Sequence, residues 1–87
     1  MTFKAGDKVF RIEVTREELT DAIPTIHNTE IVSCKDNGYY VKVQYAELWY
    51  SEVYATYIQA ARAQRLIIEK RIARLEAAVE RLRQALQ

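Results

Sequence analysis

The chain has 87 residues, which is room for one small domain, and a domain of this size buries a smaller share of its surface than a larger one. Its composition, 49% hydrophobic and 29% charged residues, excludes a disordered chain. The net charge of +1 excludes a strong overall attraction to nucleic acid or membranes, so the local placement of charge is more informative.

The first predicted element is a half-buried strand at residues 9–14, after a turn at residues 3–8. Apolar and polar side chains alternate along it, which is the period of a strand that lays one face on a core. The face expected to be buried carries Phe10, Ile12 and Val14.

A short helix is expected next, at about residues 16–22. Thr15 and Glu18 have the spacing of a capping box, in which each side chain satisfies the backbone N–H of the other residue. The helix should end before Pro24, because proline disfavours helical geometry in the residue that precedes it. A polar connector is expected around residues 27–28.

A β-hairpin is predicted from residues 30–35 and 39–45, which flank the pair Asn37-Gly38. An Asn-Gly pair favours a two-residue type I′ turn with both residues at positive φ. Such a turn fixes the register of the two strands. The residues expected to face each other are Cys34 with Val41 and Val32 with Val43.

The hairpin is expected to be apolar on one face and polar on the other, as in an antiparallel ribbon with one wet side. The apolar face carries Val32, Cys34, Tyr39, Val41, Val43 and Tyr45. The polar face carries Ser33, Lys35, Tyr40, Lys42 and Gln44, with Ile31 as the apolar exception.

One long C-terminal helix is predicted to follow. Residues 46–50 suit either a last short strand or the beginning of this helix, and we expect Ser51 to be the N-cap. Residues 52–86 contain no Gly or Pro and are rich in helix formers, which gives a helix of roughly 50 Å. The chain should divide into a β-rich subdomain with the short helix at 1–50 and the long helix at 51–87, docked on the sheet at its start and self-associating at its end.

The predicted fold class is therefore α+β. It consists of a small antiparallel sheet of three or four strands around the Asn-Gly hairpin, a short helix, and one long C-terminal helix. This helix is expected to continue into a coiled-coil-like oligomerisation segment.

The end of the long helix carries a heptad pattern, with β-branched residues at two a positions and Leu at two d positions. These residue types favour a coiled coil of two parallel helices, in which Arg71 at g faces Glu76 at e of the partner helix. The alternative is that the stripe packs on the sheet of its own chain. Because the stripe continues beyond the reach of the strands, we favour a homodimer or higher oligomer. The interface positions are Ile68, Ile72, Leu75, Val79, Leu82 and Leu86.

Aromatic and apolar residues near the start of the helix also recur at helical spacing, and we expect them to pack on the apolar face of the hairpin. Tyrosine leaves a polar tip that needs a partner, but a core is favoured over a ligand-stacking site. These residues are Tyr50, Tyr54, Tyr57, Ile58 and Ala61. Leu66 and Ile67 lie outside the heptad seam, which indicates that a second surface touches the helix there.

No residue pattern indicates catalysis or a cofactor. The single histidine, His27, has no carboxylate or nucleophile placed beside it by the sequence, and a metal site needs several ligands. The lone Cys34 cannot form an internal disulfide and should behave as a small apolar residue. The chain has no glycine-rich phosphate loop, signal-peptide core or membrane-spanning stretch. We expect a non-enzymatic, cytoplasmic protein with no metal, cofactor or membrane partner.

Basic residues outnumber acidic ones on the helix, and Lys70, Arg74 and Arg81 share the face opposite the heptad seam. With Tyr40 and Lys42 of the hairpin, they are candidate contacts for nucleic acid or another anion. A further hypothesis is a dimer that encloses a small anionic ligand, such as a nucleotide, between tyrosines and helix arginines. The alternative is that the basic side of the helix binds no ligand and only keeps the helix soluble.

The opening Ala5-Gly6-Asp7-Lys8-Val9-Phe10, followed by the Asn-Gly hairpin, resembles the start of small SH3-like barrels. The overall plan of a small sheet and a long helix resembles accessory proteins encoded by phages and mobile elements. The heptad pattern itself predicts a homo-oligomeric interaction protein that binds and regulates another macromolecule, most simply another protein, and such a role would suit an accessory protein of this kind.

Overall fold

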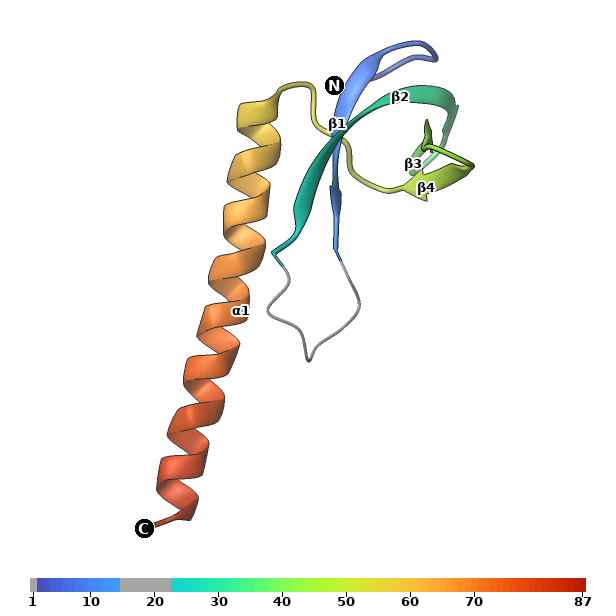
Figure 1. Ribbon diagram of the computed structural model, residues 1–87. Coiled ribbons are helices and arrows are strands. Elements are labelled where there is room, and N and C mark those ends of the chain that lie inside the picture. Colours follow the sequence, from blue (N-terminus) through green and yellow to red (C-terminus); the bar gives the residue numbers. More distant parts are fainter. Residues whose placement is uncertain (1, 15–22) are drawn as a thin grey trace.

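The computed structural model describes residues 2–14 and 23–87 and has an α+β fold (Figure 1). Four antiparallel strands form one sheet in the order β1-β2-β3-β4, and one long helix follows. The predicted antiparallel sheet and long C-terminal helix are confirmed. The short helix predicted at about 16–22, with its capping box at Thr15, lies outside the described residues. The elements are β1 (Lys8–Glu13), β2 (Thr25–Lys35), β3 (Gly38–Lys42), β4 (Glu47–Tyr50) and α1 (Tyr57–Ala85).

Strand β1 is covered on both faces, and the predicted core face is wrong. Val9 is fully buried and Arg11 is only 9% exposed, so their face is the one turned to the core. Phe10 lies on the other face, where its ring meets Tyr57 of α1 edge-on, with the ring centroids 6.0 Å apart. Val14 is 50% exposed. Alternation alone could not identify the core face, because a second layer also covers the opposite side of this strand.

Strand β2 is long and bent, and it joins the two halves of the sheet (Figure 1). Its first half pairs with β1, where Arg11 is opposite His27, and its second half pairs with β3, where Ile31 is opposite Val41. The polar connector predicted around residues 27–28 is therefore wrong. These residues are extended because their backbone pairs with β1, whatever the polarity of their side chains.

A hairpin joins β2 to β3, but the predicted turn and register are wrong. The turn residues are Asp36 and Asn37, and Lys35 pairs with Gly38. In the part of the chain that the structure describes, Gly6 alone has a positive φ, so the type I′ turn at Asn37-Gly38 does not form. The turn lies one residue earlier than the Asn-Gly signal indicates.

An irregularity in β2 between Ile31 and Ser33 shifts the register and changes which side chains are buried. An extra residue in one strand stays unpaired and exchanges the faces beyond it. Ile31, expected on the polar face, is 1% exposed opposite Val41. Cys34 and Tyr45, expected on the apolar face, are exposed, Tyr45 by 91%.

The core of the sheet is small. Val9, Ile31 and Val41 form its centre. Four partly buried side chains pack around them, namely Phe3, Tyr39, Tyr50 and Val53. Because so few apolar side chains are fully buried, the layer added by α1 on β1 and β2 is an important part of the fold.

The chain returns to β1 before the helix begins. The backbone N–H and C=O of Tyr54 both bond to Phe10, at 2.8 and 2.9 Å. Helix α1 then starts at Tyr57, where Thr56 and Gln59 form a reciprocal capping box. The prediction of a Ser51 N-cap is wrong, because residues 51–54 are used to reach β1 and the local capping signal comes afterwards.

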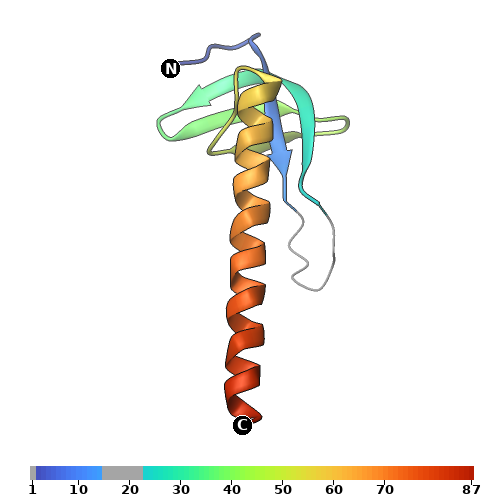
Figure 2. The same ribbon diagram turned by 90° about the vertical axis from the view of Figure 1, so that its left-hand side faces the viewer.

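Helix α1 docks on β1 and β2 through small and partly buried residues. Ala60 is fully buried, and Gln64 donates a side-chain hydrogen bond to the carbonyl oxygen of Pro24. Of the predicted docking residues, Tyr50 packs against the core from β4, whereas Tyr57 and Ile58 are 59% and 63% exposed, so they do not form the one helical docking face that was expected. Beyond this contact no other strand or helix of the described residues accompanies α1, and the molecule measures 58 × 25 × 22 Å (Figure 2).

Candidate self-association surface

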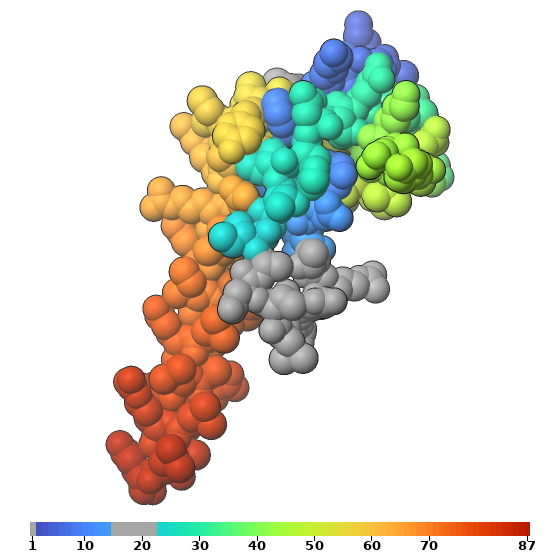
Figure 3. Space-filling model, viewed as in Figure 1, coloured from blue at the N-terminus to red at the C-terminus, as the bar shows by residue number. Residues whose placement is uncertain are grey.

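An exposed apolar stripe follows one side of α1 beyond its contact with the sheet. Five of the six heptad positions are largely exposed in the single chain, and Ile68, which lies nearest to the sheet, is partly buried. Figure 3 shows the last part of the helix projecting beyond the strands. The exposed side chains, called the apolar stripe below, are Ile72 (49%), Leu75 (61%), Val79 (46%), Leu82 (64%) and Leu86 (87%).

The apolar stripe lies beside the face that α1 places on the sheet. Ala60, Gln64 and the partly buried Ile67 mark the docking face. With about 3.6 residues per turn, the centre of the stripe is roughly a quarter of a turn away from it. Leu82 lies on the same side of the helix as Gln64, and it stays uncovered because it is about 27 Å further along the axis, past the end of the strands (Figure 3).

The side of α1 that bears its acidic residues is organised by ion pairs within the helix. Arg65 Nε lies 2.8 Å from Glu69 Oε1, and Arg83 Nη1 lies 3.9 Å from Glu80 Oε2. Exposed pairs of this kind contribute about 0.3–0.5 kcal/mol each. Both ion pairs lie beside the apolar stripe, and no charged side chain belongs to the stripe itself.

The predicted nucleic-acid or anion contacts lie on two separate surfaces. Lys70, Arg74 and Arg81 are exposed on α1, whereas Tyr40 and Lys42 lie on β3, at the far side of β1 and β2 from the helix (Figure 1). The structure thus brings together the three helix cations but does not join them to the hairpin residues.

On β3, Tyr40 belongs to an aromatic cluster that the sequence did not reveal. Its ring meets Trp49 of β4 edge-on, with centroids 5.4 Å apart, and Lys35 Nζ lies 4.7 Å from the ring centroid. Gly38 lies directly beneath Trp49, and its small size makes room for the indole. Cross-strand aromatic contacts of this kind stabilise an antiparallel pair.

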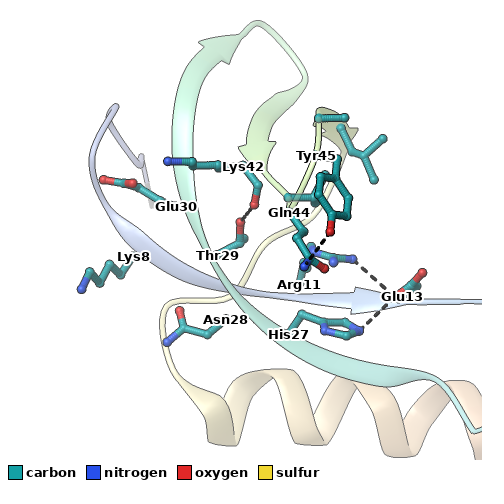
Figure 4. A pocket seen from close by; sticks show the side chains of 13 residues that line it. Lys8, Arg11, Glu13, His27, Asn28, Thr29, Glu30, Lys42, Gln44 and Tyr45 are labelled. Atoms are coloured by element: carbon teal, nitrogen blue, oxygen red, sulfur yellow. Dashed lines mark hydrogen bonds and ion pairs between the residues drawn. The ribbon is translucent and has the colours of Figure 1, made fainter.

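A polar cluster occupies an open cleft of about 960 Å³ beside β1 and β2. Arg11 and His27 both point to Glu13, whose Oε2 lies 3.8 Å from Arg11 Nη1 and 2.9 Å from His27 Nε2 (Figure 4). The same Arg11 nitrogen donates a hydrogen bond of 2.6 Å to the hydroxyl of Tyr50. Arg11 is nearly buried, so this cluster ties β1 to β4. Sequence reasoning missed it because Glu13 meets His27 only through the register of β1 and β2.

Within residues 2–14 and 23–87, the thiol and the potential metal ligands do not form a reactive or metal-binding site. Cys34 is exposed, and its thiol donates to the backbone oxygen of Phe3 at 3.2 Å. No group of three or more His, Cys, Asp or Glu side chains gathers there in a way that could hold a metal ion. Across the same ranges, α1 is the one long helix, and it is too polar to cross a membrane.

No protein-family model matches this chain, and neither a curated protein nor a solved structure is detectably similar to it. The resemblance to small SH3-like barrels and to phage accessory proteins therefore stays a hypothesis. What the chain does has to be inferred from its own surfaces.

Proposed function

We propose that this chain is a non-enzymatic interaction protein that assembles as a homodimer through the C-terminal half of α1. The observation that carries the proposal is the apolar stripe, which is about half exposed or more at every position in the single chain. An apolar row of this length on a protruding helix is typical of an interaction surface.

A second copy of this chain is the partner that fits the stripe best. The spacing of four and three residues is that of a coiled-coil seam, and Ile72 and Val79 at a with Leu75 and Leu82 at d are the residue types that favour two parallel helices. The ion pairs of Arg65 and Arg83 stay beside the seam and do not obstruct it.

The energy of this contact follows from the exposure of its side chains. Complete burial of a leucine contributes about 1.5–3 kcal/mol, so burying the exposed 61% of Leu75 contributes about 1–2 kcal/mol per chain. A dimer contains two copies. Leu75→Ala is therefore expected to weaken the dimer by about 2–4 kcal/mol, a rise in the dissociation constant of roughly 30- to 700-fold.

The decisive experiment compares Leu75→Asp combined with Leu82→Asp against Leu66→Asp. Leu66 is 51% exposed and lies on the other side of the helix, so it is a control of matched residue type. Light scattering at micromolar concentration should give the mass of a dimer for the unchanged chain and for Leu66→Asp, and that of a monomer for the double variant. A monomeric unchanged chain, or equal effects of both variants, would remove the basis of the proposal.

Helix orientation has its own test. In a parallel pair, Val79 at an a position faces Val79 of the partner closely enough for a disulfide. We expect Val79→Cys, in a Cys34→Ser background, to form a covalent dimer rapidly under mild oxidation. Slow cross-linking of this variant in a protein of dimeric mass would indicate antiparallel helices.

A further inference from the structure

The basic charge of this chain is concentrated in its helix. Residues 57–87 contain seven basic and three acidic side chains, a net charge of +4, whereas residues 1–56 contain six basic and nine acidic side chains, a net charge of −3. The overall charge of +1 hides this polarity. A polyanion approaching the molecule is therefore attracted to α1 more than to the rest of the chain.

Five of the seven basic side chains of α1 fall into two groups that differ in their partners and in the side of the helix that they occupy. Arg65 and Arg83 are neutralised by glutamates of the same helix. Lys70, Arg74 and Arg81 are exposed and form no ion pair or hydrogen bond with any part of the chain that the structure describes. These three cations are called the basic face below, and they are available to an external anion.

The basic face is straight and free of carboxylates. Spacings of four and seven residues place Lys70, Arg74 and Arg81 on one side of the helix, along about 17 Å of its axis. The helix glutamates lie about a quarter of a turn away or more. Ala77, which is exposed between Arg74 and Arg81, is small enough to let a partner approach the helix backbone.

The chemistry of the basic face favours one class of partner. A membrane surface requires an apolar helix face with the basic one, and a protein interface usually has aromatic or apolar anchors at its centre. The apolar stripe lies on the opposite side of α1, so a membrane that buried it would leave these cations turned away from the lipid headgroups, and Leu66 is the one exposed large apolar side chain of α1 on their side. Single-stranded nucleic acid would call for stacking aromatics. The phosphate backbone of a duplex requires only positive charge along its length.

We propose that Lys70, Arg74 and Arg81 bind the phosphate backbone of double-stranded nucleic acid, without reading its sequence. The basic face lies across the helix from the apolar stripe, so phosphate contact and self-association use different sides of α1. The proposal does not depend on the homodimer, since a single chain carries the complete basic face.

The test measures the salt dependence of binding to a short labelled DNA duplex of arbitrary sequence by fluorescence anisotropy. Three phosphate contacts predict that log K falls with log salt with a slope of about −2.7, which weakens binding about 40-fold for a fourfold rise in salt. Replacing all three cations of the basic face by Gln should abolish binding at low salt.

A second triple variant with the same net charge serves as the control. Arg62→Gln, Arg65→Gln and Arg83→Gln remove three cations from other sides of the helix, and the salt slope should stay close to that of the unchanged chain. Equal loss in both triple variants would mean that only net charge matters, which overturns the proposal.

Absence of binding by the unchanged chain at low salt, or equal binding to polyglutamate, would overturn it as well. Circular dichroism of both triple variants checks that the helix is retained. The mass of each variant by light scattering separates failure of this proposal from failure of the proposed dimer.

Discussion

Gly38→Ala is expected to destabilise the sheet by displacing Trp49. Gly38 is buried in β3 beneath the indole. A methyl group there would lie 2.5 Å from the backbone oxygen of Tyr50 and 2.7 Å from a ring carbon of Trp49. The closest ordinary approach of carbon to oxygen is about 3.3 Å, so β4 must move by about 0.8 Å or the indole must turn away.

The magnitude follows from two opposing effects. Overpacking of this kind costs about 1–3 kcal/mol, and the lower entropy of the unfolded alanine chain returns about 0.4–1 kcal/mol. A net loss of about 1–2 kcal/mol is expected for Gly38→Ala. For a domain of this length, each 1 kcal/mol lowers the melting temperature by about 4–8 °C.

Urea unfolding followed by the fluorescence of Trp49 measures both the stability and the displacement. Gly6→Ala is the matched control, because Gly6 has open space around it but a φ of +94°. It should cost about 1–2 kcal/mol through backbone strain while the native emission of Trp49 stays unchanged. If Gly38→Ala altered neither the stability nor the emission, the close packing of β3 against β4 would be refuted.

Three further predictions concern the junctions of the fold. Thr56→Ala removes the cap of α1 and should lower the free energy of unfolding by about 1 kcal/mol in a urea titration. Tyr50→Phe deprives the nearly buried Arg11 of a hydrogen-bond acceptor and should cost about 1–3 kcal/mol in the same assay. Burial first, and then the hydrogen bond and charge of Glu52, raise the pKa of Tyr54 above its ordinary value of 10.0. The resulting contribution to stability is complete below pH 10.0 and is lost as the pH rises through the folded-state pKa of Tyr54. Glu52→Gln should lower this pKa in a tyrosinate absorbance titration, and it should thereby reduce the alkaline loss of stability.

The elements that could be predicted from the sequence are those set by local composition. The long run without Gly or Pro predicts α1, and the β-rich first half predicts an antiparallel sheet. The beginning of α1 was also readable locally, because Thr56 and Gln59 have capping-box spacing. Ser51 also suits an N-cap by residue type, and nothing in the local sequence shows that Tyr54 pairs with Phe10 before the helix begins.

The details that could not be predicted depend on contacts between distant parts of the chain. The irregularity in β2 after Ile31 reverses the burial of its neighbours, and an alternating pattern carries no sign of it. The contact of Glu13 with His27 likewise follows from the register of two strands. The heptad positions of the apolar stripe could be selected from spacing alone, but their exposure depends on where α1 leaves the sheet.

The backbone pair of Tyr54 with Phe10 has a mechanical consequence. Only Ala55 and Thr56 separate this clamp from the first turn of α1, and Thr56 is itself held by the capping box. The first turn of the helix is thus tied closely to β1, and the hydrogen bond from Gln64 to the carbonyl oxygen of Pro24 adds a second attachment further along. A contact made at the far end of α1 therefore lies at a distance from the sheet that the length of the helix sets.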